Sequence, residues 1–323
     1  MPENLKINNK NNKSNNSNKK DDGRISNDDP NKLEKLINAG KIHNKVMEEA
    51  LKLIKPGEKL YNVAEYVENR IRELGGQVAF PCNISINEVA AHYTPCYGDK
   101  KVFLEGDLVK LDIGVHIDGY IADGALTIDL SNTYNDLIKA SEYALNQAIN
   151  EIIPPMNVGK IGAIIQEAIE GYGYKPISNL SGHVMEKYIL HSGVNIPNIK
   201  ENSKEFIDVG DVVAIEPFAT DGFGQVVDGV EKYIFKYLNS RPVRLPLAKT
   251  LLKLIEKKYP FLPFSERDVL KENPKYRPAL KNLMNSGCIY GYPVLTEKNR
   301  GMVSQSEHTV LITENGAKII TKS

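Results

Sequence analysis

The chain has 323 residues, with 41 Lys plus Arg and 41 Asp plus Glu, so its formal net charge is zero. This balance provides no global field that would favour nucleic acid or an anionic membrane as a partner. The three cysteines, Cys82, Cys96 and Cys288, include no Cys-x-x-Cys pair, which argues against a disulfide framework or a thiolate zinc site. With no run of eighteen apolar residues and no apolar N-terminal stretch, we expect a cytoplasmic protein without membrane contact.

Residues 1–30 differ in composition from the rest of the chain. Ten of the first 31 residues are Asn, and most of the others are Lys, Ser and Asp. Such a segment buries too little apolar surface to offset the entropy lost on ordering. We therefore expect a disordered Asn/Lys-rich tail, followed by one folded domain over residues 31–323.

Apolar residues recur at helical spacing in two pairs of segments, and each pair is followed by strand-like sequence. The predicted helices span 33–54, 62–74, 137–153 and 161–171. Pro56-Gly57 ends the first pattern, and Pro154-Pro155 ends the third. Two helices, a break and a sheet, taken twice, predict a pseudo-twofold α+β domain.

A seven-residue phrase also occurs twice. It reads GDLVKLD at 106–112 and GDVVAIE at 210–216, 104 residues later, and it ends in Asp112 or Glu216. Burying an acid at the end of a strand is costly unless a metal, a base or a hydrogen-bond network neutralises it. The repeat therefore predicts two halves that face one site, although acids that cap strand ends in solvent would give the same pattern.

The segment 112–123 predicts a β-hairpin, because Asp118-Gly119 is a turn signal between two β-rich runs. In that register Asp112 lies opposite Ala125, and Asp123 shares the face of Asp112. The two acids would be about 7–8 Å apart at the backbone, close enough for their side chains to converge on shared metal ions. A cation between them would remove their repulsion.

Histidines and one further acid extend the candidate site. His183 and His191 lie among Val, Ile and Leu and are flanked by glycines, which favours a site over two core residues. Glu307 and His308 stand at the entrance of a strand, and alternation sends them to opposite faces, so only one can join a given site. His92 follows an apolar stretch and would be unremarkable alone.

Together these segments closely resemble the methionine aminopeptidases, in the pita-bread fold that they share with prolidase and aminopeptidase P. The match runs from about residue 32 to the C-terminus. Its motifs are AFP at 79–81, NEVAAHYTP at 87–95, Asp112 with Asp123, GH at 182–183, IEP at 215–217 and EHT at 307–309. The resemblance implies a pita-bread (creatinase/aminopeptidase) catalytic domain that binds two divalent metal ions.

The resemblance also assigns roles to individual residues. The implied metal ligands are Asp112, Asp123, His183, Glu216 and Glu307. Asp123 and Glu307 would bridge both ions, Asp112 would hold one ion, and His183 with Glu216 would complete the other. Four carboxylates and one imidazole form a hard site that suits Mn, Fe(II), Co or Zn.

The implied activity is removal of the N-terminal methionine from nascent proteins and peptides whose second residue is small, by a hydroxide held between the two metals. Glu216 is the candidate general base. His92 and His191 are placed by resemblance to bond the scissile amide and the tetrahedral intermediate. Phe80, Leu190 and Tyr292 match family positions that line an apolar pocket for the methionine side chain.

The subtype follows from the ninety residues between Glu216 and Glu307. The excess at about 237–294 resembles the helical, winged-helix-like insertion of type 2 enzymes, and its basic residues favour a solvated face over a nucleic-acid patch. We expect a monomer that acts on peptide and nascent-chain N-termini, with the ribosome as a candidate partner and no specific nucleic acid.

Two alternatives stay open from the sequence. A prolidase or aminopeptidase P-like X-Pro peptidase would share the five ligands, but such enzymes usually carry a large extra N-terminal domain. An inert binding module of the same fold, similar to the proliferation-associated proteins, would have lost metal ligands. All five are present in this chain.

Overall fold

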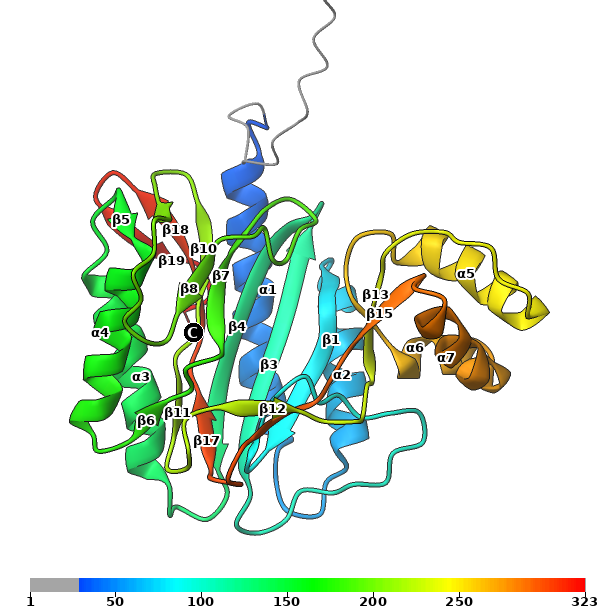
Figure 1. The fold of residues 1–323 in the computed structure, drawn as a ribbon, viewed down its shortest axis with the longest axis horizontal. Helices are drawn as coiled ribbons and strands as arrows, with labels where there is room; N and C mark the ends of the chain where they lie inside the picture. The colour runs from blue at the N-terminus through cyan, green and yellow to red at the C-terminus, as the bar shows by residue number, and fades with distance from the viewer. Residues whose placement is uncertain (1–28, 323) are drawn as a thin grey trace, which may run out of the picture.

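The computed structural model describes residues 29–322 (Figure 1). The predicted tail of residues 1–30 falls almost entirely outside the described residues. Two helix pairs form the outer layer: α1 (Lys32–Leu51), α2 (Leu60–Glu73), α3 (Asn135–Asn150) and α4 (Val158–Gly171). No helix in the described range is both long enough and apolar enough to span a membrane.

The four predicted helices are confirmed, but two of them end earlier than the apolar pattern suggests. Beyond α1, the N–H groups of Leu53 and Ile54 bond to carbonyls only three residues back, a tighter turn than an α-helix makes. The residues before Pro56 and Pro154 are poorly suited to helix, and α3 ends at Asn150. Proline therefore sets both ends, whereas the apolar periodicity runs on.

The first helix pair packs on a three-stranded antiparallel sheet of order β1–β3–β4. Its strands are β1 (Gln77–Ile86), β3 (Leu108–Ile117) and β4 (Tyr120–Asp129), and α1 and α2 lie behind them in Figure 1. The predicted hairpin register is confirmed, because Asp112 pairs with Ala125. Asp118 and Gly119 have φ of 51° and 88°, as a type I′ turn requires.

The second helix pair packs on strands of the second half. Its main sheet has the order β19–β18–β10–β7–β8. These strands are β7 (Ser181–Met185), β8 (Asn195–Pro197), β10 (Val212–Ile215), β18 (His308–Thr313) and β19 (Gly316–Ile319). The halves meet at a seam, where Glu307 and Ala125 exchange backbone hydrogen bonds, at 2.9 and 3.4 Å. Each half has its own hydrophobic cluster. The sequence placed both repeated acids at strand ends, which is correct for Glu216, but Asp112 lies in the middle of β3 because that strand continues to Ile117 in the hairpin with β4.

Short strands complete the rim around this seam. β6 (Lys175–Pro176), β11 (Phe218–Thr220) and β17 (Val303–Gln305) form one sheet, β2 (Val89–Ala91), β12 (Val226–Asp228) and β16 (Leu295–Glu297) form a second, and β5 (Met156–Asn157) pairs with β9 (Phe206–Ile207). Glu216, the second of the two repeated acids, lies between β10 and β11, at the edge of the seam.

Most of the residues from 237 to 294 form a separate helical lobe, seen at the right of Figure 1. It contains α5 (Pro246–Lys258), α6 (Glu266–Glu272), a 3₁₀ turn (Pro274–Tyr276) and α7 (Arg277–Asn285), beside β13 (Ile234–Tyr237), β14 (Phe264–Ser265) and β15 (Ile289–Tyr292). The lobe has a hydrophobic cluster of its own. Its status as a type 2 insertion stays a prediction.

One buried arginine fastens this lobe to the first half. Arg267 in α6 is 0% exposed and forms ion pairs with Glu68 and, at 2.8 Å, with Glu65, both in α2. Its Nη1 also donates to Thr94 Oγ1 at 3.1 Å and to the carbonyl of Pro95 at 2.6 Å. The lobe therefore docks through a buried charge network, and its position depends on that network remaining complete.

Removing this arginine should be costly. Arg267→Met leaves the Glu68 carboxyl buried without its partner, and we expect the free energy of unfolding to fall by about 3–5 kcal/mol. The matched control is Arg300→Met, because the Arg300 side chain is 73% exposed and its ion pair with Glu88 is 3.2 Å long. That change should cost about 0–1 kcal/mol. Urea unfolding of both variants measures the difference, and equal losses would contradict the docking role.

Candidate functional site

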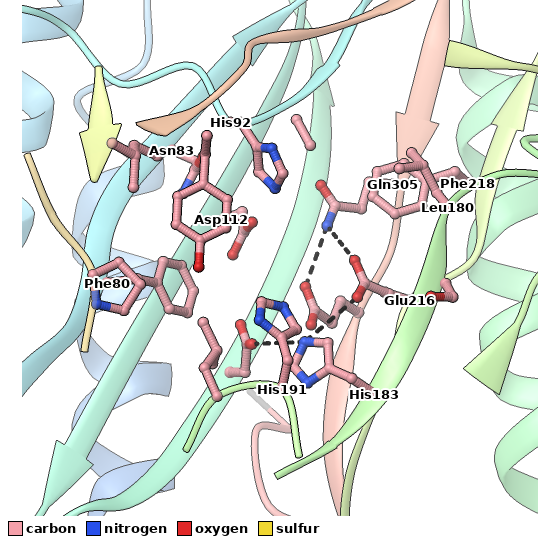
Figure 2. A pocket seen from close by; sticks show the side chains of 18 of the residues that line it. Phe80, Asn83, His92, Asp112, Leu180, His183, His191, Glu216, Phe218 and Gln305 are labelled. Atoms are coloured by element: carbon pink, nitrogen blue, oxygen red, sulfur yellow. Dashed lines mark hydrogen bonds and ion pairs between the residues drawn. The ribbon is translucent and has the colours of Figure 1, made fainter. Parts of the chain in front are cut away.

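A cavity of about 230 Å³ lies at the seam between the two halves. It brings together all ten residues that the sequence analysis singled out for metal or substrate binding: Phe80, His92, Asp112, Asp123, His183, Leu190, His191, Glu216, Tyr292 and Glu307. Figure 2 shows Phe80, Asn83 and Asp112 on one side of this cavity and His183, Glu216 and Gln305 on the other. Residues more than 200 positions apart in the chain therefore share one chamber.

Strand pairing explains how the acids converge. Asp112 pairs with Ala125, and Asp123 pairs with Gly114, so both carboxylates project from one face of the hairpin, two register positions apart. Glu307 reaches the same place because its backbone N–H bonds to the carbonyl of Ala125. The hairpin of the first half thus presents two acids, and the start of β18 in the second half adds a third.

The second half supplies an imidazole and a fourth acid. His183 in β7 pairs with Ala214 in β10. Ala214 is two residues before Glu216, so the pairing brings His183 close to that acid. His183 Nε2 is 3.6 Å from Asp123 Oδ2 and 3.6 Å from Glu216 Oε1. Ligand atoms of Asp123, His183 and Glu307 all lie within 4.8 Å of one another. This spacing suits donor atoms that surround a cation.

The protonation preferences of these groups show how unfavourable the cluster is without a cation. Burial, followed by repulsion from neighbouring acids, raises the pKa of Asp123, Glu216 and Glu307 well above the ordinary range. Burial also raises the pKa of Asp112. Burial lowers the pKa of His183 far below its ordinary value, so its imidazole is neutral and carries a lone pair. The contacts of His183 with the acids are therefore not ion pairs at neutral pH.

The donor set fits divalent cations. Within residues 29–322, the buried atoms Asp112 Oδ1 and Asp123 Oδ1 have no hydrogen-bond partner, and such orphaned acceptors are rare in folded proteins. Cations would satisfy these oxygens and offset the repulsion between the acids. Carboxylate oxygens with one neutral imidazole are suitable ligands for Mn, Fe(II), Co or Zn.

Two further histidines face the cavity as neutral groups. His92 has a φ of 65°, an uncommon conformation for a residue other than glycine. Its Nδ1 is 3.2 Å from the carbonyl of Pro293. Because a carbonyl can only accept a hydrogen bond, Nδ1 carries the proton, and Nε2 of the neutral ring is an acceptor. Burial lowers the pKa of His92, and it lowers the pKa of His191 to about 4.

An apolar wall adjoins the polar cluster. Phe80 and Leu190 are buried beside the cavity, and Gly114 makes room for Phe80, since a Cβ at Gly114 would come within 2.2 Å of the Phe80 ring. Tyr292 packs edge-on against His92, with ring centroids 5.4 Å apart. The cavity therefore combines an oxygen-rich end with an apolar end, the arrangement expected for a ligand with one polar and one apolar part.

Gln305 and Asn83 are among the cavity residues that the sequence analysis did not single out. Gln305 Nε2 donates to Glu307 Oε2 at 3.2 Å and to Glu216 Oε2 at 3.5 Å (Figure 2), so it joins two of the acids. Its position two residues before Glu307 was the available signal, because strand alternation puts such residues on one face. Asn83 also lines the cavity, and its sequence position gave no comparable signal.

The remaining histidines lie elsewhere. His116 lines a second cavity of about 400 Å³, where its ring packs edge-on against Tyr188 at 5.6 Å. His308 Nδ1 lies 3.2 Å from Thr321 Oγ1, and His43 Nε2 lies 3.2 Å from the carbonyl of Gly124. None of these three lines the cavity that holds the acids.

The raised pKa values predict a pH-dependent stability of the metal-free protein. An acid whose pKa is raised on folding binds its proton more tightly in the native state, so stability falls as pH rises through the unfolded value of about 4 toward the folded value. We expect the Tm of chelator-treated protein to fall between pH 5 and pH 8. Excess Mn²⁺ at pH 8 should restore it, as scanning calorimetry would measure.

The control for this pH effect is Asp123→Asn, which removes one buried charge. The metal-free variant should lose less Tm between pH 5 and pH 8 than the wild type, because groups outside the cluster affect both proteins equally. Parallel Tm curves for the two metal-free proteins would contradict the repulsion described for these acids.

Comparison with known proteins places this geometry in context. The sequence profile of metallopeptidase family M24 matches residues 34–314. The methionine aminopeptidase of Methanocaldococcus jannaschii is 64% identical over 289 residues, which cover 90% of this chain and 98% of that protein. An identity of 64% along nearly the whole of both chains shows a relationship closer than a shared fold alone.

Solved structures support the same architecture. The methionine aminopeptidase of Thermotoga maritima superposes with a TM-score of 0.66 at 25% identity, over 91% of this chain and 98% of that one. A thermophilic Arx1 has a TM-score of 0.80 at 22% identity, over 90% of both chains, a likeness of fold alone. The predicted α+β pita-bread fold is confirmed.

Proposed function

The chain belongs to metallopeptidase family M24, and from this premise we propose that it is a type 2 methionine aminopeptidase. It removes the N-terminal methionine from nascent proteins and peptides when the second residue is small. One observation carries the proposal: a single cavity joins the five potential metal ligands, two neutral histidines and an apolar wall. Comparison supports it through the 64% identity to a methionine aminopeptidase along 98% of that protein.

The five ligands would hold two divalent ions, with Asp123 and Glu307 shared between them. When bound, such ions lower the pKa of a water molecule, polarise a carbonyl and attract a free amine. Fe(II), Mn, Co and Zn all fit the donor set. Gln305 holds Glu216 and Glu307 in place through its amide hydrogens, so the ligands need little rearrangement to bind a cation.

The chain's own groups then act on the peptide. Glu216, whose pKa is raised by burial and by nearby acids, accepts a proton from the attacking water. His92 Nε2 is an acceptor, so it accepts a hydrogen bond from the N–H of the scissile amide and orients the amide. His191 is neutral at physiological pH and donates to the oxygen on which negative charge develops. Phe80, Leu190 and Tyr292 exclude water from the first side chain.

Neither alternative fits the molecule as well. An inert module would lack part of the donor set, whereas all five ligands line one cavity. An X-Pro peptidase does not explain the high identity to a methionine aminopeptidase across nearly the whole of that protein. The type 2 assignment draws on the helical lobe within residues 237–294. Cytoplasmic location, a monomeric state and contact with the ribosome stay predictions.

Metal content and turnover should separate the ligands from the other polar groups. Asp123→Asn and His183→Ala should lose bound metal and reduce kcat/KM by at least about 10- to 100-fold, the loss that changes in the partners of metal ligands already cause. His92→Ala and His191→Ala should keep the metal and lose about 100- to 10,000-fold, mainly in kcat, because their bonds strengthen in the transition state. Elemental analysis and steady-state kinetics on the same samples measure both quantities.

The controls are His116→Ala and His308→Ala, since neither residue lines the cavity. Both variants should retain metal and activity within a few-fold of wild type. Loss of metal from His116→Ala, or full metal retention and activity in Asp123→Asn, would require a different ligand set.

Substrate choice tests the proposed function directly. An apolar wall should accept the unbranched thioether of methionine and reject a charged side chain, whose desolvation would go uncompensated. We expect cleavage of Met-Ala and Met-Thr peptides, no cleavage of Met-Lys or Met-Glu peptides, and no cleavage of N-acetylated or formylated peptides. Mass spectrometry of a small panel measures this, with Ala-Pro-Ala included for the X-Pro alternative. Preferential cleavage of Lys-Ala or Ala-Pro-Ala would contradict the methionine assignment.

A further inference from the structure

Asn83 reaches the cavity because β1 contains a bulge. Phe80 pairs with Gly114 and Asn83 pairs with Asp112, so three residues of β1 span a distance that two residues of β3 cover. Residues three apart in a regular strand face opposite sides. The extra residue reverses this alternation, and both Phe80 and Asn83 line the cavity. Glu68 supports the bulge, because its Oε1 accepts from the N–H of Cys82 at 3.1 Å.

The orientation of the Asn83 amide is fixed by its own strand. Asn83 Nδ2 donates to the carbonyl of Pro81 at 2.9 Å. A flipped amide would place two acceptors against each other, so Oδ1 must point away from Pro81. Asn83 is 5% exposed, and its Oδ1 has no hydrogen-bond partner among the described residues. A buried acceptor held in place without a donor is unfavourable, and a donor group on a ligand in the cavity would satisfy it.

The neighbours of Asn83 identify the chemistry of that donor. Asp112, one of the proposed metal ligands, lies directly opposite in the β1–β3 register, where paired Cα atoms are about 4.5–5.5 Å apart. Phe80, at the apolar wall, lies on the other side of the bulge. With a proposed metal ligand on one side and an apolar wall on the other, Asn83 Oδ1 is placed to accept from a group that carries N–H bonds and is attached to an apolar side chain.

We propose that Asn83 is a specificity-determining residue whose Oδ1 accepts a hydrogen bond from the free α-amino group of the first residue of the peptide. This inference rests on the proposed function and adds a recognition element to it. A free amine offers two or three N–H bonds, whereas an acylated nitrogen offers one and carries a bulky carbonyl group. Asn83 therefore helps the cavity select an unblocked N-terminus, independently of the pocket for the side chain.

A pair of ligands that differ only in the amine isolates this contact. L-Methionine carries the α-amine, and 4-(methylthio)butanoate has the same chain and carboxylate without it. In metal-loaded Asn83→Leu we expect the affinity for L-methionine to fall about 10- to 100-fold, the range of one hydrogen bond to a charged or polar group. The affinity for 4-(methylthio)butanoate should stay within twofold of wild type. Isothermal titration calorimetry measures both.

Three controls separate the possible roles of Asn83. Asn83→Asp keeps an acceptor oxygen and should bind L-methionine better than Asn83→Leu does. Asn83→Ala serves if the leucine variant fails to fold, as judged by circular dichroism. Asn179→Ala is a matched change in the same cavity, because both polar atoms of Asn179 already bond to Val226, at 2.8 and 2.9 Å. It should not discriminate between the two ligands.

The outcomes also distinguish this inference from the proposed function. Equal losses of affinity for both ligands would show that Asn83 has a packing role. Loss of metal from Asn83→Leu would show that Asn83 is a metal ligand. Either result overturns amine recognition, and so does unchanged binding of L-methionine by Asn83→Leu. A wild-type protein that cleaves Met-Ala peptides but does not distinguish the two ligands also overturns it. If the wild type binds L-leucine or L-alanine through the amine in preference to L-methionine, the proposed function fails while the role of Asn83 stands.

Discussion

The rest of the structure depends on the crowding of four buried carboxylates at the seam between the two halves. Burial raises the pKa values of Asp112, Asp123, Glu216 and Glu307, and repulsion from neighbouring acids raises those of Asp123, Glu216 and Glu307 further. Within the described residues, the only basic side chain in ion-pair range of these acids is His183, and burial keeps its imidazole neutral. A protein cation therefore does not balance the cluster. The buried acids lower the stability of the metal-free protein, and divalent ions that bind between them would recover it.

The two halves of the fold together bring the four carboxylates to the seam. The first half contributes Asp112 and Asp123 from within β3 and β4, and the second half contributes Glu216 and Glu307 from positions that adjoin β10 and β18. Each half has its own hydrophobic cluster. The reciprocal backbone bonds between Glu307 and Ala125 join the halves at the point where the acids meet. Because β3 and β4 hold Asp112 and Asp123 in a fixed register, small movements of loops do not relieve the repulsion between these two acids. The helical lobe adds Pro263 to the cavity wall and is docked on the first half by the buried Arg267 network.

Sequence patterns predicted the features that depend on local periodicity. The repeated phrase located Asp112 and Glu216, and the Asp118-Gly119 turn set the register that aligns Asp112 with Asp123. The other ligands came from family resemblance. Three features could not be read from the chain. The bulge in β1 places Asn83 on the face of Phe80 against simple alternation. Arg267 finds partners about 170 to 200 residues away, a purely tertiary contact. Strand alternation puts His116 on the same face of β3 as Asp112, but its ring packs against Tyr188 in another cavity.

The proposed function requires that Asp112, Asp123, His183, Glu216 and Glu307 bind two cations at the seam. Crystals of chelator-treated protein can be soaked in Mn²⁺, and diffraction data collected at the manganese absorption edge then locate the ions. We expect two anomalous peaks per chain in the cavity, with Asp123 and Glu307 in contact with both and Asp112 and His183 each in contact with one. A single peak at saturating Mn²⁺, or peaks away from these five residues, would contradict the dinuclear site and the mechanism built on it.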